Sequence, residues 1–163
     1  MKFKRHSWLV AVVLLLIIAL MYRCGYLIRG GVAAELETRT RQHTLQPLQL
    51  TEIAAFPWDR VVFLGPYDNQ ALTDRALGFH WADFQSFGLE NSDGFSLLVF
   101  ANSENVVRAE KIRRCRPDFA KELVGKVVLR ANAIFVIEDT GDCRVLKLAN
   151  ELPTVIHRAR PGR

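Results

Sequence analysis

The longest uniform apolar stretch of the chain lies near its start. Residues 8–22 are fifteen consecutive apolar side chains, and apolar character resumes at 24–28 after Arg23. About twenty apolar residues suffice to cross the hydrocarbon core of a bilayer, because a helix rises about 1.5 Å per residue. The pattern predicts an uncleaved transmembrane signal anchor at 8–28, preceded by a short cytoplasmic flank at 1–7.

Two alternative interpretations of this segment also predict export but differ in how the chain is anchored. A cleaved signal peptide needs small residues soon after the apolar run, and the first such group, at 31–34, follows about ten residues too late. A lipoprotein would be acylated at Cys24, but Met21, Tyr22 and Arg23 stand where that signal has leucine and small residues. We therefore expect the anchor to be retained.

The pattern changes twice after the anchor. Residues 29–46 are mostly polar with a helical composition, which is typical of a solvated stalk. Residues 47–152 then read as one compact unit, the extracytoplasmic domain. Residues 153–163 contain few apolar positions and are expected to be a flexible tail.

Short apolar runs between turn residues mark the strands of this domain. Two pairs of them are joined by polar turns as hairpins, which implies antiparallel pairing. One helix, capped by Asp68 or Asn69, ends at Gly78, and a second, capped by Asp118, ends at Gly125. The sequence thus predicts an α+β domain with a mainly antiparallel sheet and one to three helices. The strands expected in that sheet are Arg60–Leu64, Phe95–Phe100, Val106–Ile112, Ala133–Glu138 and Cys143–Ala149.

The net charge of +5 belongs to the N-terminal region. Five of the 22 basic residues and none of the 17 acidic residues precede residue 31, so the remainder is neutral overall. A neutral domain offers no basic footprint to DNA or RNA, and we expect no nucleic-acid partner. Lys2, Lys4 and Arg5 outweigh Arg23 and Arg29 across the span, so the N-terminus should be cytoplasmic and the domain outside.

The three cysteines fall in different surroundings. Cys115 and Cys143 both lie in the exported domain, at the end of one expected strand and the start of another. Disulfides persist in exported proteins, so we expect these two residues to be bonded. The alternative is a pair of buried free thiols. Cys24 is left over at the membrane boundary.

The densest group of charges begins within the third expected strand and continues past its end. Five cations occur within nine residues, against Glu110 alone. Charged residues on a strand edge block unwanted pairing, which is the simpler interpretation. The alternative is a patch for an acidic protein partner, a lipid head group or an anionic envelope polymer. The five cations are Arg108, Lys111, Arg113, Arg114 and Arg116.

The stretch FPWDRVVFLGPYD, at Phe56–Asp68, combines large rings, an Asp-Arg pair and a Gly-Pro-Tyr turn. Such rings more often fill the edge of a core than bind a ligand, and a tyrosine after Gly-Pro often pins a turn through its hydroxyl group. Adjacent residues on a strand point to opposite faces, so the Asp-Arg pair is not expected to act on one substrate. The residues concerned are Trp58, Asp59, Arg60, Pro66 and Tyr67.

Together with ALGF at Ala76–Phe79 and DGFSLLVF at Asp93–Phe100, this stretch resembles a group of small exported bacterial proteins. In that group an aromatic-x-Trp-Asp strand, a Pro-Tyr turn, a Leu-Gly helix end and an Asp-Gly strand recur in this order. They follow a lipoprotein signal or a membrane anchor. The resemblance spans roughly residues 50–138. It implies export and a shared fold, and it supplies no catalytic residue.

The chain contains none of the common motifs for phosphate loops, serine hydrolases, zinc proteases or paired cysteines. We expect no catalytic, cofactor-binding or metal-binding residues. The expected function is a non-enzymatic protein-binding module, held in the bacterial inner membrane by one span, such as an immunity-type or envelope-assembly partner. One alternative is an enzyme that acts on cell-wall or lipid substrates through His80, Asp83 and Asp59. Another is a purely structural anchored domain.

Overall fold

A computed structural model of the chain describes residues 31–42 and 46–151. These residues form two four-stranded sheets and a few helices, so the expected α+β class is confirmed. The flank, span and tail predicted at 1–7, 8–28 and 153–163 lie outside the described residues. Within the described part of the chain, no helix is long and apolar enough to cross a membrane.

Strands and short helices alternate along the described chain. The α-helices are α2 (Val32–Arg41), α3 (Leu50–Ile53) and α4 (Gln70–Leu77). The strands are β1 (Leu48–Gln49), β2 (Arg60–Leu64), β3 (Phe95–Asn102), β4 (Asn105–Arg113), β5 (Asp118–Phe119), β6 (Val127–Leu129), β7 (Ile134–Asp139) and β8 (Arg144–Leu148). The 3₁₀ helices are η1 (Ala82–Phe87), η2 (Leu89–Asn91), η3 (Lys121–Leu123), η4 (Arg130–Asn132) and η5 (Ala149–Glu151).

The strands divide between two sheets, with the orders β1-β7-β8-β5 and β4-β3-β2-β6. All neighbouring strands pair antiparallel except β5 and β8, which are parallel. Both expected hairpins are present, as β3–β4 and β7–β8. The prediction of one sheet for the five expected strands is wrong, because these two hairpins lie in different sheets. Apolar side chains on both faces of β2 and β3 allow one face to be covered by the second sheet.

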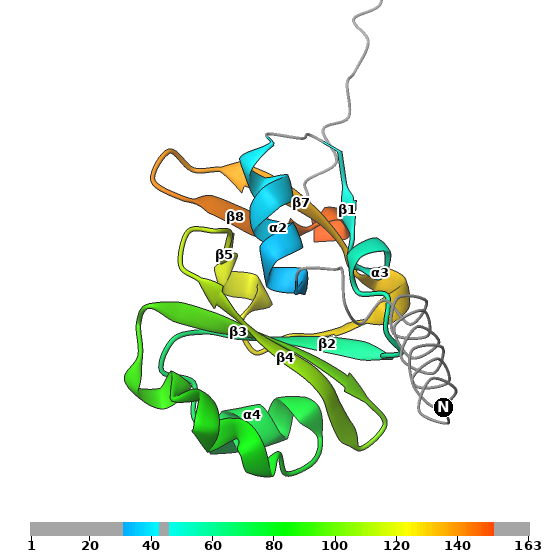
Figure 1. Ribbon diagram of the computed structural model, residues 1–163, viewed down its shortest axis with the longest axis vertical. Helices are drawn as coiled ribbons and strands as arrows, with labels where there is room; N and C mark the ends of the chain where they lie inside the picture. The colour runs from blue at the N-terminus through cyan, green and yellow to red at the C-terminus, as the bar shows by residue number, and fades with distance from the viewer. Residues whose placement is uncertain (1–30, 43–45, 152–163) are drawn as a thin grey trace, which may run out of the picture.

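Figure 1 shows the resulting layers, with sheet β1-β7-β8-β5 at the top, sheet β4-β3-β2-β6 in the middle and α4 beneath. Between the sheets, the ring of Phe63 meets those of Phe119 and Phe135 edge to face, with centroids 4.9 and 5.4 Å away. On the opposite face of the middle sheet, Leu64 belongs to a second cluster with Leu77 of α4. The central strand β2 is therefore buried on both faces, as its continuous apolar run predicts.

Local capping signals define α4. The side chain of Asn69 accepts a hydrogen bond from the Leu72 N–H at 3.0 Å, and Gly78 ends the helix with a φ of 82°. The N–H of Gly78 donates to the carbonyl of Asp74 at 2.8 Å. The sequence leaves the N-cap open between Asp68 and Asn69, and Asn69 is the one used. Gly78 ends the helix as expected, because a left-handed residue after a helix favours glycine.

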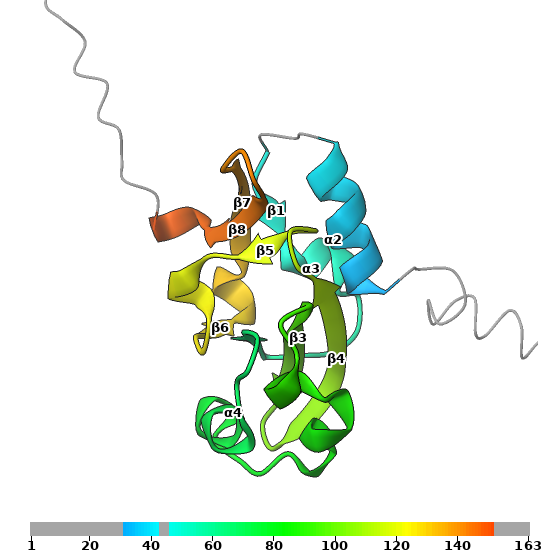
Figure 2. The same ribbon diagram turned by 90° about the vertical axis from the view of Figure 1, so that its left-hand side faces the viewer.

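The helix α2 belongs to the folded domain, whereas the sequence pattern favours a solvated stalk. Val32, Leu36 and Thr40 are spaced by four residues and are all buried. Glu110 of β4 accepts hydrogen bonds from the N–H groups of Val32 and Ala33, at 3.0 and 2.7 Å. Figure 2 shows α2 beside β4 on one side of the molecule, with β6 on the other. A stripe of two apolar residues and a threonine is too narrow for periodicity to predict this packing.

The segment after Asp118 is also different from the expected capped helix. Asp118–Phe119 forms β5, which pairs in parallel with Val145 and Leu146 of β8 before the 3₁₀ helix η3 begins. Asp118 Oδ2 accepts a hydrogen bond from Arg114 Nε at 2.6 Å. The carboxylate is therefore engaged by a side chain, and the backbone is held in an extended conformation by strand pairing.

Candidate functional site

The stretch Phe56–Asp68 begins as a packed corner ahead of β2. Trp58 is 4% exposed, its indole N–H donates to the Ala54 carbonyl at 3.1 Å, and its ring lies 5.2 Å from that of Phe100. The guanidinium of Arg130 lies 5.5 Å from the centroid of the indole ring. Trp58 is thus a core residue with its polar atom satisfied, and little of its surface is left for a ligand.

The Asp59–Arg60 pair joins three parts of the fold. Arg60 Nη1 lies 3.1 Å from Asp59 Oδ1, so the expectation that these side chains point to opposite faces is wrong. Asp59 precedes the first residue of β2, where the alternation of a strand does not yet apply. Asp59 accepts from the Ser103 N–H at 2.7 Å, and Arg60 donates to the carbonyls of Leu77 and Ser103 at 3.0 and 2.6 Å. The pair ties β2 to the β3–β4 turn and to the end of α4.

The turn that follows β2 exposes an aromatic side chain. The N–H of Gly65 donates to Asp68 Oδ2 at 2.9 Å, and the N–H of Tyr67 donates to the Leu89 carbonyl at 3.2 Å. The Asp68 carboxylate and the backbone therefore hold the turn around Pro66, whereas the sequence predicts that the Tyr67 hydroxyl holds it. Tyr67 has a φ of 66° and is 60% exposed. Burial raises the pKa of the Asp68 carboxyl, although the hydrogen bond from Gly65 opposes this shift.

His80 pairs with a different carboxylate from the one expected. Its Nδ1 lies 2.7 Å from Asp74 Oδ2, while Asp74 Oδ1 accepts from the Trp81 N–H at 3.0 Å. Burial of Asp74 favours its neutral form, but the hydrogen bonds from His80, Trp81 and Gln70 together lower the pKa of this carboxyl below its usual value. Among the described residues, no hydrogen bond or ion pair joins His80 to Asp83. The His80–Asp83 pair on which an enzymatic function would rest is therefore not formed.

Most of the basic cluster at 108–116 is engaged within the domain. Among the described residues, Arg113 is the one member of the five without an ion pair or a ring contact. The cluster is thus largely neutralised by its neighbours, and the binding of an acidic partner stays a prediction. The contacts of the other four are Arg108 with Glu110 and the Phe56 ring, Lys111 with the Phe95 ring, Arg114 with Asp118, and Arg116 with Glu37.

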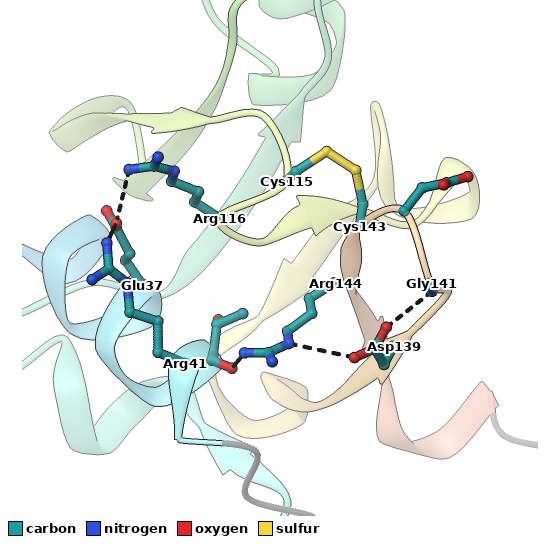
Figure 3. A pocket seen from close by; sticks show the side chains of 10 residues that line it. Glu37, Arg41, Cys115, Arg116, Asp139, Gly141, Cys143 and Arg144 are labelled. Carbon is teal, nitrogen blue, oxygen red and sulfur yellow. Dashed lines mark hydrogen bonds and ion pairs between the residues drawn. A yellow bond between two sulfur atoms is a disulfide. The ribbon is translucent and has the colours of Figure 1, made fainter.

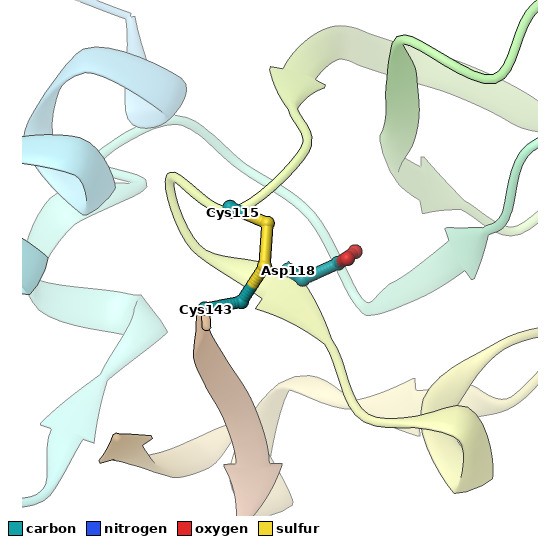
Figure 4. Close-up of side chains that lie close together, drawn as sticks. All are labelled: Cys115, Asp118 and Cys143. Atoms are coloured by element: carbon teal, nitrogen blue, oxygen red, sulfur yellow. A yellow bond between two sulfur atoms is a disulfide. The ribbon is translucent and has the colours of Figure 1, made fainter. Parts of the chain in front are cut away.

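A disulfide joins Cys115 to Cys143, as the sequence predicts. It links the loop after β4 to the start of β8 (Figure 4). Such bonds persist in oxidising compartments outside the cytoplasm. Asp118 places a carboxylate oxygen within 4.8 Å of both sulfur atoms, which is close enough for shared metal ligation. Sulfur atoms bonded to each other are not thiolates, however, and Asp118 is engaged by Arg114, so this state offers no metal site.

A polar pocket of about 370 Å³ lies beside the disulfide, between α2 and the β7–β8 turn (Figure 3). Glu37 of α2 pairs with both Arg41 and Arg116, and Arg144 donates to the carbonyl of Thr40. The hydrogen bond from Arg41, with a further contribution from Arg116, holds the pKa of Glu37 below its usual value. The ion pairs of Glu37 and the hydrogen bond from Arg144 fasten α2 to the neighbouring strands and loops.

A more apolar feature is the groove between α4 and β6, which has a volume of about 420 Å³. Leu72 on α4 faces Val124 and Val127 across it, and these three side chains are 45%, 38% and 40% exposed. Gly65 makes room for the second wall, because a Cβ at this position would lie 2.9 Å from a methyl carbon of Val124. The groove is lined by Leu64, Asp68, Leu72, Arg75, Ala76, Val124, Gly125 and Val127.

Two further exposed residues lie within two positions of the groove lining in the chain. Tyr67 precedes Asp68 in the chain, and Leu129, 57% exposed, follows Val127 on the same face of β6. Of the seven large apolar side chains that the described residues expose, three line the groove and two more are within two positions of its lining in the chain. Isolated exposed apolar residues are ordinary, but a cluster of them marks an interaction surface.

No pattern in the sequence indicates this groove. No strand is expected at Val127–Leu129, since three residues are too few for a period-two pattern, and Tyr67 is expected only as part of a structural corner. The β-branched pair after Gly125 is the signal that would have indicated an edge strand. Comparisons of the chain with protein-family models, curated proteins and solved structures gave no match. The resemblance to small exported bacterial proteins stays a prediction.

Proposed function

We propose that the protein is a membrane-anchored, extracytoplasmic protein-binding module of the bacterial envelope. The observation that carries this proposal is the exposed apolar groove between α4 and β6. The disulfide supports an oxidising compartment, and the apolar run at 8–28 supports the anchor. The resemblance to exported bacterial proteins supports the envelope as the setting.

The groove has the composition of a docking site. Partly exposed leucine and valine side chains release water when a partner covers them, which contributes roughly 25 cal/mol per Å² of apolar surface buried. Tyr67 supplies a rigid ring that loses little conformational entropy on contact, and such rings often dominate the energy of an interface. Because the same surface is open in the isolated domain, a protein partner is the natural occupant.

The basic cluster at 108–116 is the weaker candidate for the contact. Four of its five cations already interact with acids or rings of the same chain, so a partner would have to compete with those contacts. The enzymatic alternative depends on a His80–Asp83 pair, and His80 binds Asp74. The apolar groove therefore carries the proposal ahead of both.

Site-specific photocrosslinking in intact membranes tests this proposal. A benzophenone amino acid replaces Leu72 in the groove, and the matched control carries it at Val107, an exposed valine of β4. We expect a discrete protein adduct from the Leu72 position that is lost when the groove residue Val127 is changed to Asp in the same chain. Equal adducts from both positions, or none from Leu72, would overturn the proposal. Thermal unfolding of each variant checks that the domain remains folded.

A further inference from the structure

The two edges of the middle sheet have opposite characters. The edge strand β4 carries Arg108, Lys111 and Arg113, and its Glu110 is bound to the start of α2. Charges of this kind discourage pairing with another strand. The other edge strand, β6, has the sequence Val-Val-Leu and lies beside the apolar groove. One edge is thus protected by charge, and the other is apolar.

The register of β6 shows which of its backbone groups face outward. β6 pairs antiparallel with β2, with Val127 opposite Val62 and Leu129 opposite Arg60. The next residue, Arg130, donates its N–H to the Asp59 carbonyl at 2.8 Å, so this pair is hydrogen-bonded. Hydrogen-bonded and non-hydrogen-bonded pairs alternate along an antiparallel ladder. The N–H and C=O of Val127 and the N–H of Leu129 therefore point away from β2.

The side chains of the same two residues define the adjoining surface. Val128 belongs to the core between the sheets, so Val127 and Leu129 lie on the opposite face, the face that α4 covers in part. Both are exposed, and Val127 lines the groove with Leu72. An incoming strand would place every second side chain on this face, directly over the groove.

A cation at the groove indicates the charge of the occupant. Arg75 lines the groove, is exposed, and has no ion pair among the described residues. The one carboxylate in the lining belongs to Asp68, and it accepts a hydrogen bond from the N–H of Gly65 in the preceding turn. An acidic side chain in the bound segment would therefore find an available guanidinium at this site.

We propose that β6 is a docking edge for an extended segment of a partner protein, which adds a fifth strand to the middle sheet. The segment has apolar residues at alternate positions that fill the groove and a carboxylate that pairs with Arg75. Main-chain hydrogen bonds to Val127 and Leu129 hold it in place, as in other cases of strand addition. This inference rests on the proposed protein-binding function and specifies the form of the partner.

The test uses the full chain in lipid nanodiscs and a displayed library of random 12-residue peptides. We expect selected peptides to carry apolar residues at positions i and i+2 and an acid nearby, and to bind less well to an Arg75→Glu variant. Val127→Pro removes an outward N–H and should weaken the strongest peptide about 5- to 10-fold, whereas Val127→Ala, which keeps the N–H, should weaken it about 3-fold or less.

Amide hydrogen exchange provides a second readout that does not depend on variants. The amides of Val127 and Leu129 should gain protection when the peptide binds, while that of Val128, already bonded to β2, should change little. Peptides with apolar spacing of three and four residues that tolerate Val127→Pro would overturn strand addition and leave the proposed function standing. If the chain self-associates through the same edge and no peptide binds, the inferred partner protein is wrong and the occupant is a second copy of this chain. If the same peptides are selected with equal affinity by a Leu72→Asp variant, both proposals are overturned.

Discussion

The carboxylate of Asp74 binds His80 in a structural contact, in place of the His80–Asp83 pair that an enzyme would need. It accepts hydrogen bonds from the His80 ring, the Trp81 N–H and the Gln70 amide, and these bonds fasten the end of α4 to the chain that follows it. The imidazole of His80 is largely exposed, so the interaction lies at the rim of the helical layer. Sequence proximity alone would favour Asp83, but the helix end at Gly78 turns the chain back towards Asp74.

The lowered pKa of Asp74 predicts a pH dependence of stability. A carboxyl whose pKa is lower in the folded state stabilises the fold fully above its unfolded pKa, near 4, and this contribution is lost as the pH falls through the folded pKa. We expect Asp74→Asn to lower the free energy of unfolding by about 1 kcal/mol at pH 6, with a difference from wild type that shrinks below about pH 4. Urea unfolding at a series of pH values measures it. Asp83→Asn, the matched control, should follow wild type throughout.

The close approach of Gly65 to Val124 leads to a second prediction at the residue scale. A Cβ at this position would lie 2.9 Å from Val124 Cγ1, closer than two carbon atoms normally approach. We expect Gly65→Ala to destabilise the domain by about 1–2 kcal/mol, because the wall of the groove must shift. Val124→Ala should restore most of that loss in a double-mutant cycle measured by chemical unfolding. Additive effects of the two changes would contradict the close contact.

At the scale of elements, α2 is held at its first turn by a side chain from β4. Glu110 accepts two N–H groups there, and a Cβ on Gly31 would lie 2.5 Å from one of its oxygens. We expect Glu110→Ala to lower the free energy of unfolding by about 1–2 kcal/mol and to increase exchange of the α2 amides. Glu104→Ala, in the β3–β4 turn, is the control and should change neither quantity. Unchanged protection of α2 in the Glu110 variant would contradict this role.

Elements with strong local signals could be predicted from the sequence. The Asn69 and Gly78 caps and the turns of the two hairpins depend on a few neighbouring residues, so their patterns are readable. The packing of α2, the strand at Asp118–Phe119 and the division into two sheets depend on distant partners. The groove at β6 could not be predicted for the same reason, since Leu72 and Val127 approach each other only in the folded chain.

The disulfide acts at the scale of the whole molecule, because it closes a segment that contains strands of both sheets. Cys115 and Cys143 are separated by 28 residues, and β5, β6 and β7 lie between them. We expect replacement of both by alanine to reduce the free energy of unfolding by about 3–4 kcal/mol, the value that chain entropy gives for a loop of this length. Reduced wild type should then resemble the variant. Labelling of both thiols in unfolded, unreduced protein would contradict the bond.

The capped start of α2 has a consequence for how far this domain reaches. Gly31 is the N-cap of a helix that is part of the folded body, so residues 31–41 do not form a flexible linker. If the span predicted from the sequence ends at Ile28, Arg29 and Gly30 alone separate it from that body. Three residue steps extend to about 10 Å at most. The domain would then rest against the bilayer surface on a short tether, and a partner confined to the same membrane would meet it by two-dimensional diffusion at a high effective concentration.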